Sequence, residues 1–310
     1  MSISSESPDT DITVIITTSP SPVHPSTELL MQVFESMATY AQLLWRSRVI
    51  VVCDGCKTSE KVQWRSARVD ETARLQYEEY KRKLKEMAAM VSNPSDQRTS
   101  ADVSEETQHF PPFCEILELD VNHGFGFAVR AALVTVSTTL VCVIQHDRVF
   151  MRLVPVLEAA QAIRERQEQV AYVLLPMKST QKYAVKYRMK LIEKGVKVDE
   201  ADIERWSIPL MGGLQLLPCL SWYDSTHLCS VRYYRDFIFS EEQRIVKRGG
   251  FIEGELGQLQ LPDFVELGVP AALDRWKTFL LDDGDEAPMV GHLNGKRYQS
   301  LEELQAKYGE

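Results

Sequence analysis

Three short runs of aliphatic, mostly β-branched residues constrain the fold of this chain more than any other feature. They span residues 11–18, 48–53 and 140–144. Valine, isoleucine and threonine favour extended backbone, and a short apolar run is typical of a strand that is covered on both faces. The three runs therefore predict buried strands in the interior of a sheet.

The segment between the first two runs predicts a helix. Ser26 or Thr27 is a suitable N-cap, and apolar side chains follow at helical spacing: Leu29, Leu30, Val33, Phe34 and Met37. A strand, helix, strand order is typical of a βαβ unit with parallel strands. Further strands are predicted at 114–119 and 171–175, and further helices at 66–91, 128–136 and 153–168. The predicted fold class is α/β, with a mixed, mostly parallel sheet flanked by helices.

Charge and hydropathy exclude several classes of protein. The 310 residues carry 35 Lys and Arg against 44 Asp and Glu, so the net charge is 35 − 44 = −9. This balance argues against nucleic acid as the main partner. No apolar run reaches the roughly 18–20 residues of a membrane span, and the polar, acidic start lacks the features of a signal peptide. We expect a cytoplasmic protein with a disordered tail at 1–10 and a mobile insertion at about 92–108.

Polar groups follow the predicted strands at the edge where ligands bind in open α/β sheets. They are the loop 19–22, Asp54, and the triplet Gln145-His146-Asp147. A carboxylate at the end of a rigid apolar strand can hold a hard cation, and Mg²⁺ or Mn²⁺ is commonly bound by one or two carboxylates together with phosphate oxygens. Asp147 is therefore a candidate metal ligand. The alternative is that the triplet forms a simple strand-end turn.

The order of these motifs resembles that of the GT-A fold glycosyltransferases, in particular the family 2-like inverting enzymes. The stretch from Asn122 to Arg130 (NHGFGFAVR) matches their segment Asn-x-Gly-x-x-x-Ala-x-Asn/Arg, and Gln145-His146-Asp147 stands where they carry Asp-x-Asp. The resemblance implies a GT-A-like, Rossmann-type sheet and a variant metal motif whose last Asp, Asp147, contacts the ion. The donor-binding residues that it implies are Thr18, Ser19, Pro20, Asp54, Asn122, Gly124, Arg130, Gln145 and His146.

The second half of the chain carries shorter matches to the same family. Gly249-Gly250-Phe251-Ile252-Glu253 resembles a Gly-Gly-Phe-x-Glu/Asp loop that holds the base for the acceptor, which implies Glu253 or the nearby Glu255 as catalytic base, with Asp224 in reserve. Each glutamate could equally be a solvated loop acid. A C-terminal His often joins the metal or the diphosphate in this family, which implies His292 as a metal ligand, with His227 as second choice.

The predicted protein is one GT-A-like domain with a nucleotide-sugar-binding half (11–150) and an acceptor-binding, catalytic half (151–310). Its predicted function is metal-dependent transfer of a sugar from a nucleoside-diphosphate donor, a UDP-sugar, to a hydroxyl acceptor (a glycan, protein or small molecule) with inversion. Two alternatives remain: a nucleotidyltransferase acting on a sugar phosphate, and a nucleotide-binding pseudo-enzyme. The basic stretch 178–197 is either a solvated surface or a contact to a diphosphate or an anionic acceptor.

Overall fold

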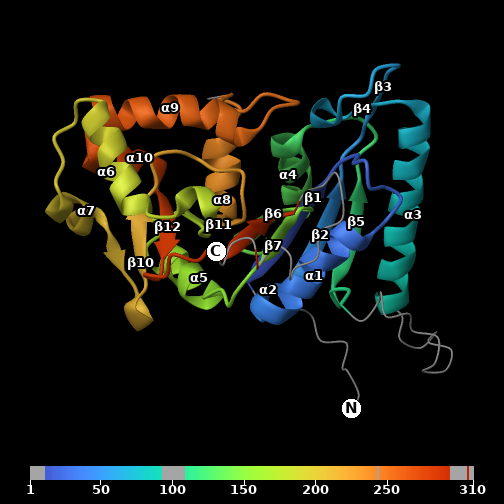
Figure 1. Cartoon of the computed structure of the whole chain (residues 1–310), viewed down its shortest axis with the longest axis horizontal. Helices are drawn as coiled ribbons and strands as arrows, with labels where there is room; N and C mark the ends of the chain where they lie inside the picture. The colour runs from blue at the N-terminus through green and yellow to red at the C-terminus, as the bar shows by residue number, and fades with distance from the viewer. Residues whose placement is uncertain (1–10, 93–108, 243, 294–305, 307–310) are drawn as a thin grey trace, which may run out of the picture.

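A nine-stranded mixed sheet runs through the computed structural model of the chain, which describes residues 11–92, 109–242, 244–293 and 306 (Figure 1). The strand order is β5-β2-β1-β6-β11-β8-β12-β10-β9. In chain order these strands are β1 (Ile12–Thr18), β2 (Arg48–Cys53), β5 (Cys114–Glu118), β6 (Leu140–Gln145), β8 (Tyr172–Leu174), β9 (Ile208–Pro209), β10 (Gln215–Pro218), β11 (His227–Ser230) and β12 (Thr278–Asp282).

Seven of the nine strands run in the same direction. Strands β5, β2, β1 and β6 are mutually parallel, and β12 is parallel to β8. Strand β11 lies antiparallel between β6 and β8, and β10 lies antiparallel between β12 and β9. The predicted α/β fold with a mixed, mostly parallel sheet is confirmed.

Helices flank this sheet along its whole width. Helices α2 and α4 contact β1 and β2, α3 contacts β5 at the right-hand edge of Figure 1, and α5 contacts β8 and β11. The helices are α1 (Glu28–Tyr40), α2 (Gln42–Trp45), α3 (Glu71–Ser92), α4 (Phe125–Leu133), α5 (Val156–Glu165), α6 (Tyr183–Glu193), α7 (Glu200–Trp206), α8 (Val231–Tyr233), α9 (Ile252–Glu266) and α10 (Val269–Trp276). Within the described ranges, none is both long enough and apolar enough to cross a bilayer.

The helix predicted at 66–91 begins later than the pattern of apolar residues indicates. Residues 64–66 form a 3₁₀ turn that ends at Ala67, whose φ of 49° is left-handed. The chain then pairs β4 (Arg68–Val69) in parallel with β3 (Lys57–Thr58) before α3 starts at Glu71. We refer to residues 57–69 as the β3–β4 arm. The predicted tail at 1–10 and all but the first residue of the predicted insertion at 92–108 lie outside the described residues.

Short antiparallel strands in the second half escape prediction from the sequence. Strand β11 has only four residues, and it follows a polar, aromatic segment that gives no strand pattern. A small second sheet pairs β7 (Arg148–Phe150) with β13 (Val290–His292) in antiparallel register, with Arg148 opposite His292. This pairing brings the end of the described chain to the residues that directly follow β6.

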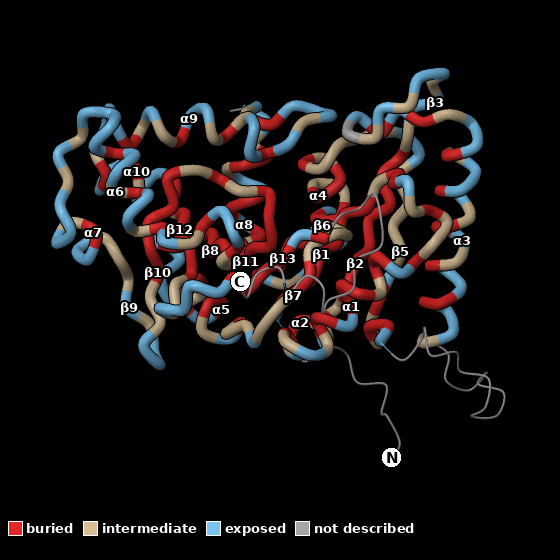
Figure 2. Tube along the Cα trace, viewed as in Figure 1, coloured by how far each residue is buried: buried red, intermediate tan, exposed pale blue. Residues whose placement is uncertain are grey.

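The core extends continuously beneath both halves of the chain. All seven residues of β1 are buried, and the strands of the large sheet are mostly buried while the outer faces of α3, α6 and α9 are exposed (Figure 2). Fully buried large side chains come from both halves: Phe34, Tyr77, Tyr172, Trp222, Phe264 and Trp276. Because one sheet contains strands from residues 12 to 282, the boundary predicted at 150 falls between strands of a shared sheet.

Gly55 lies where two loops meet at the carboxyl edge of the sheet. A Cβ atom at this position would lie 2.3 Å from the carbonyl carbon and 2.6 Å from the Cα of Val121. Backbone atoms cannot yield as a flexible side chain can, so we expect Gly55→Ala to destabilise the protein by about 1–3 kcal/mol. Urea denaturation measures this free energy.

Gly257→Ala is the matched control for this substitution. Gly257 lies within α9, and a Cβ there has nothing within 4 Å. Alanine has a higher helix propensity than glycine, so this variant should be about 0.5–1 kcal/mol more stable than the wild type. Equal stabilities for the two variants would contradict the close approach of Gly55 to Val121.

Candidate functional site

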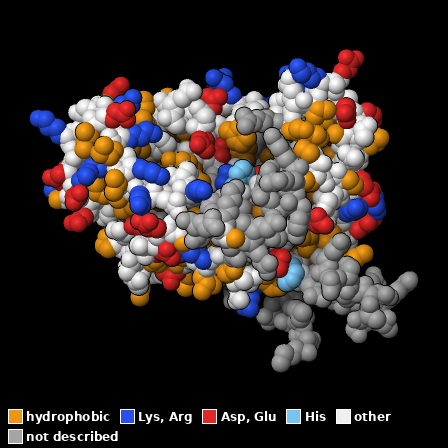
Figure 3. Space-filling model, viewed as in Figure 1, with side chains coloured by type: hydrophobic (Ala, Val, Ile, Leu, Met, Phe, Trp, Pro, Cys, Tyr) orange, Lys and Arg blue, Asp and Glu red, His pale blue; other side chains and the backbone are white. Residues whose placement is uncertain are grey.

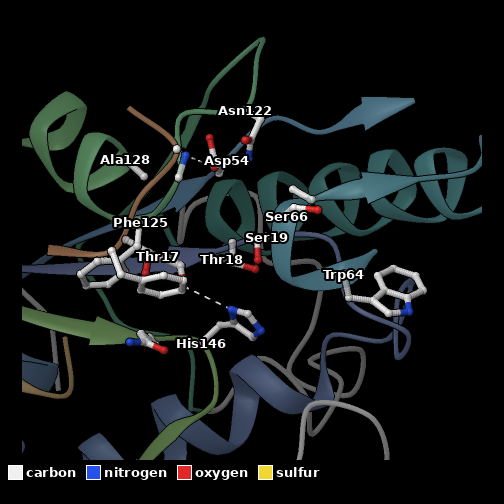
Figure 4. A pocket seen from close by; sticks show the side chains of 15 residues that line it. Thr17, Thr18, Ser19, Asp54, Trp64, Ser66, Asn122, Phe125, Ala128 and His146 are labelled. Atoms are coloured by element: carbon white, nitrogen blue, oxygen red, sulfur yellow. Dashed lines mark hydrogen bonds between the residues drawn. The ribbon is translucent and has the colours of Figure 1, made fainter. Parts of the chain in front are cut away.

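A pocket opens at the carboxyl ends of β1, β2 and β6. Its lining comes from both halves of the chain and from the β3–β4 arm, and comprises Thr17, Thr18, Ser19, Asp54, Trp64, Ser66, Ala67, Asn122, Gly124, Phe125, Ala128, Gln145, His146, Gly249 and Phe251. Figure 4 shows Trp64 and Phe125 on opposite sides of the pocket, with Thr17, Thr18 and Ser19 between them. The side chains therefore combine hydroxyls, amides and aromatic faces.

Seven of the nine predicted donor-binding residues line this pocket: Thr18, Ser19, Asp54, Asn122, Gly124, Gln145 and His146. Two do not. Pro20 is buried in the loop that follows β1. Arg130 lies two residues, about 200° of helix rotation, beyond the pocket-lining Ala128 on α4. Its guanidinium stacks on Phe127 and lies 3.6 Å from the carboxylate of Glu241. Arg130 therefore lies outside the residues that line this pocket.

The Asp54 carboxylate holds the loop that forms one wall of the pocket. One oxygen accepts the backbone N–H groups of Gly55 (2.9 Å) and His123 (2.8 Å). The other accepts the N–H of Gly124 (2.8 Å) and the Asn122 side-chain amide (3.0 Å). Burial raises the pKa of Asp54, and the N–H groups of residues 123 and 124 offset part of that rise. Four donors fill a carboxylate's roughly four acceptor positions, so Asp54 shapes the pocket and has no acceptor position left for a ligand.

Glycines allow the loops of the two halves to touch. Gly124 has a φ of +75°, and a Cβ there would lie 2.7 Å from the backbone of Gly249. The Gly249 N–H donates to the carbonyl of His123 over 2.7 Å. Beside this contact, the rings of Phe125 and Phe251 stack at 5.9 Å with 17° between their planes. Phe251 is 52% exposed, so part of an aromatic face is open to the pocket.

The β3–β4 arm contributes pocket residues that sequence analysis missed. Trp64 and Ser66 lie on the side opposite Phe125 in Figure 4, and Ala67 also lines the pocket. In the sequence, Trp64 stands in a polar stretch between a predicted strand and a predicted helix. That position alone does not show whether its side chain lines a pocket or lies on the surface. The left-handed backbone at Ala67 and the pairing of β3 with β4 fix where the arm lies.

The first two residues of the triplet 145–147 are tied to neighbouring elements. The Gln145 side-chain amide donates to the backbone carbonyl of Asp224 over 2.6 Å. The backbone N–H of His146 donates to the carbonyl of Thr17 at 3.0 Å, and its Nδ1 lies 3.3 Å from the same oxygen. Gln145 therefore bridges the pocket to the segment before β11.

Asp147 and His292 are 145 positions apart in sequence, and the β7–β13 pairing brings them together. His292 Nε2 lies 3.0 Å from Asp147 Oδ2, and the N–H of Leu293 donates to the carbonyl of Asp147 at 2.8 Å. Burial raises the pKa of Asp147, but the hydrogen bond from His292 and the nearby charges of His146 and Arg148 outweigh it, so the net shift is downward. Asp147 thus favours the ionised form.

The Asp147–His292 pair carries groups that suit a cation. Asp147 Oδ1 is buried and has no hydrogen-bond partner among the described residues, which leaves an anionic oxygen available. The His292 side chain is 53% exposed and can turn. No group of three or more His, Cys, Asp or Glu side chains suited to a metal occurs within the described ranges. The donor set of one carboxylate and one imidazole fits a divalent cation that takes its remaining ligands from water and phosphate.

Asp224 and Glu253 form a reciprocal pair beside Gln145. Asp224 Oδ2 accepts the N–H of Glu253 at 3.0 Å, and Glu253 Oε2 accepts the N–H of Asp224 at 3.2 Å. Asp224 Oδ1 also accepts the Trp222 indole N–H at 3.0 Å. Burial raises the pKa of Asp224 to about 7; the N–H of Glu253 lowers it and the Glu253 charge raises it further. A carboxyl group with this pKa can exchange a proton near neutral pH.

The glutamates predicted on a glycine-rich loop lie instead in a helix. Glu253 and Glu255 belong to the first turn of α9, where negative charge is favoured by the helix dipole. Glu253 is exposed, whereas Glu255 is half-buried and lies 3.8 Å from Lys247. His227, the second choice for the metal, is fully buried, with its ring nitrogens 2.6 Å from the Ser225 carbonyl and the Tyr234 hydroxyl. It is a core residue.

No protein-family model matches this chain, and no curated protein matches it. Similar solved structures include S. aureus TarS, with a TM-score of 0.41 and 16% identity over 88% of this chain and 35% of that one. A TarS 1–349 structure in complex with UDP has a TM-score of 0.40 and 16% identity over 88% and 58%. Mycobacterium tuberculosis glucosyl-3-phosphoglycerate synthase in complex with Mn²⁺, UDP-glucose and phosphoglyceric acid has a TM-score of 0.41. Its sequence identity is 13%, and the match covers 96% of this chain and 76% of that one. The chain spans about a third of TarS. These values are low, so we argue function from the residues of this chain.

The hydrogen bonds of Asp54 predict a large cost for its amide. In Asp54→Asn one acceptor oxygen becomes an N–H₂ donor, so two of the four protein donors lose their partner. Each buried donor left without an acceptor costs about 1–3 kcal/mol, and we expect a loss of at least about 2 kcal/mol in the free energy of unfolding. The exposed Asp120 provides the control, since Asp120→Asn should stay within about 0.5 kcal/mol of wild type. Similar stabilities for the two variants would refute the anchoring role of Asp54.

Proposed function

We propose that this chain is a divalent-metal-dependent glycosyltransferase that moves a sugar from a nucleoside-diphosphate donor, a UDP-sugar, to a hydroxyl acceptor with inversion. The observation that carries the proposal is the Asp147–His292 pair beside the pocket, with one buried Asp147 oxygen that has no hydrogen-bond donor in the part of the chain that the structure describes. The order of sequence motifs and the position of the pocket at the carboxyl edge of the sheet support the same proposal.

Asp147 and His292 are the residues that would hold Mn²⁺ or Mg²⁺. When bound, the ion would supply Lewis-acid stabilisation of the charge that develops on the leaving diphosphate. The buried carboxylate of Asp147 contributes a fixed negative charge at the end of β6, and its lowered pKa keeps that charge at neutral pH. The β7–β13 pairing sets the spacing between the two side chains.

The pocket beside this pair suits a nucleoside. Trp64 and the Phe125–Phe251 stack offer aromatic faces for a planar base, which gains from stacking. The hydroxyls of Thr18 and Ser19 and the amide of Asn122 provide hydrogen-bonding groups between them. Asp54 acts as a positioning residue, because it holds the loop 122–124 in place.

Asp224 is the best-supported general base. An acceptor hydroxyl is a weak nucleophile and needs a base within hydrogen-bond reach. The pKa of Asp224 is raised to about 7, the value at which a base serves best near neutral pH. The backbone carbonyl of Asp224 accepts the amide of Gln145, which lines the pocket. Glu253 is the second candidate because it is exposed and contacts the Asp224 backbone. Glu255 is the third, since its carboxylate lies near Lys247.

One observation favours the pseudo-enzyme alternative. Gln145 stands where the family motif has its first Asp, and its amide is committed to the Asp224 carbonyl. In that alternative the chain would bind the nucleotide without turning over the donor. Turnover of a UDP-sugar in the presence of Mn²⁺ distinguishes the two, because the pseudo-enzyme would show intact nucleotide binding and no release of UDP.

Isothermal titration with UDP tests the metal site directly. We expect wild-type protein to bind UDP at least about tenfold more tightly, ~1.4 kcal/mol, with Mn²⁺ than without it. Asp147→Ala should lose this metal-dependent gain and retain the weaker binding that the pocket provides. Asp120→Ala, which removes an exposed carboxylate, is the control and should behave as wild type. If neither Mn²⁺ nor Asp147→Ala changes the affinity for UDP, the proposal is wrong.

The pH dependence of turnover identifies the base. A base must be ionised to accept a proton, so activity should fall about tenfold per unit as the pH drops below about 7, the pKa of Asp224. Asp224→Asn should lower kcat by about 10²–10⁴-fold and remove this acidic limb. Should Glu253→Gln remove the limb instead, the role passes to Glu253. An acidic limb that survives in both variants, each shown to be folded by its thermal transition, would contradict base catalysis by this pair.

A further inference from the structure

Helix α6 has apolar side chains on two opposite faces. Tyr183, Tyr187 and Leu191 are buried and pack into the core. Val185, Met189 and Ile192 are exposed by 57%, 57% and 47%. At about 100° of rotation per residue these three side chains share one stripe, roughly opposite the buried face. We refer to Val185, Met189 and Ile192 as the outer stripe.

Cations surround the outer stripe. Residues 178–197 contain six Lys, one Arg and one Glu, a net charge of 6 + 1 − 1 = +6, in a chain whose net charge is −9. Lys186 and Lys190 lie on one side of the stripe, together with the exposed Glu193. Arg188 lies on the other side and pairs with Glu200 at 2.6 Å. Lys190 and Lys194 make no ion pair within the described residues. At the left of Figure 3, where Figure 1 shows α6, apolar side chains lie exposed among Lys and Arg, with some Asp and Glu nearby.

The chemistry of this surface favours a lipid partner over a protein. Protein interfaces are depleted of lysine and enriched in aromatic residues and arginine, whereas the cations around the outer stripe are almost all lysines and its apolar members are aliphatic. Lysine has a long stem that can lie along acyl chains while its ammonium reaches a phosphate. A helix with aliphatic side chains on its outer face and flanking lysines is typical of one that lies in a membrane interface.

We propose that α6 docks this protein on an anionic membrane surface. Val185, Met189 and Ile192 insert between lipid headgroups, and the flanking lysines bind the lipid phosphates. The helix is well placed for this, because its buried face is anchored in the core and it leaves the sheet directly after β8, at the same edge that carries the pocket. The proposal is independent of the reaction that the pocket performs.

Vesicle sedimentation tests the proposal with the whole chain. We expect binding to vesicles of phosphatidylcholine mixed with phosphatidylserine, no binding to phosphatidylcholine alone, and weaker binding at high salt because salt screens the lysines. Two variants separate the contributions: Val185→Ser/Met189→Ser/Ile192→Ser removes the outer stripe and Lys186→Glu/Lys190→Glu reverses two charges. Each should weaken vesicle binding on the order of tenfold.

The control substitutes exposed apolar residues elsewhere. Val134→Ser/Leu157→Ser changes one side chain directly after α4 and one on α5, which are 81% and 58% exposed, respectively, and this variant should bind vesicles as wild type does. Absence of binding to anionic vesicles, or equal binding by the α6 variants and wild type, would overturn the proposal. So would light scattering that finds a wild-type dimer converted to a monomer by the outer-stripe variant without any vesicle binding, because a second copy would then cover the stripe.

Discussion

The carboxyl end of β6 is the point on which both the sheet and the candidate site depend. Strand β6 pairs in parallel with β1 and antiparallel with β11, so it joins the two halves of the sheet. The residues at its end are held from three directions: His146 by Thr17, Gln145 by Asp224, and Asp147 by His292. Each contact depends on a different pairing: the first on β1 with β6, the second on the segment that enters β11, and the third on β7 with β13. The geometry of the site is therefore a consequence of the strand order.

Buried carboxylates order the loops around that point. Asp54 gathers the N–H groups of the loop 122–124, and Asp224 caps the start of α9 from outside the helix by accepting the N–H of Glu253. Burial opposes ionisation in both cases and raises both pKa values, while the N–H groups lower them. The outcomes differ in degree, because the carboxylate of Glu253 adds repulsion at Asp224. A buried carboxylate that accepts backbone N–H groups therefore anchors a loop at Asp54, and at Asp224 it can exchange protons near pH 7.

The sequence predicted the first half of the fold and little of the second, and the reason is physical. Strands β1, β2 and β6 are apolar runs whose pattern does not depend on their neighbours. Strands β11 and β13 have four and three residues and exist because adjacent strands pair with them. Asp147 is a candidate metal ligand from its place after an apolar strand, whereas His292 is implied by the resemblance alone, since no local pattern relates residues so far apart. Motif matching ignores which face of a helix a residue occupies, so it gave no indication that Arg130 lies outside the pocket lining. Trp64 was missed because the β3–β4 arm takes its position from tertiary contacts.

Charge is distributed unevenly between the candidate site and the surface around α6. One carboxylate and one imidazole give the protein few charges with which to hold a cation, and the neutral Gln145 adds none. Under the proposed function the phosphates of the donor must therefore supply much of the ion's coordination, so metal and nucleotide should bind with positive coupling, each raising the affinity of the other by the same factor. The segment 178–197, which contains α6, has a net charge of +6. The remainder of the chain has a net charge of −9 − 6 = −15. A surface so polarised orients the molecule in the field of an anionic surface before any contact forms.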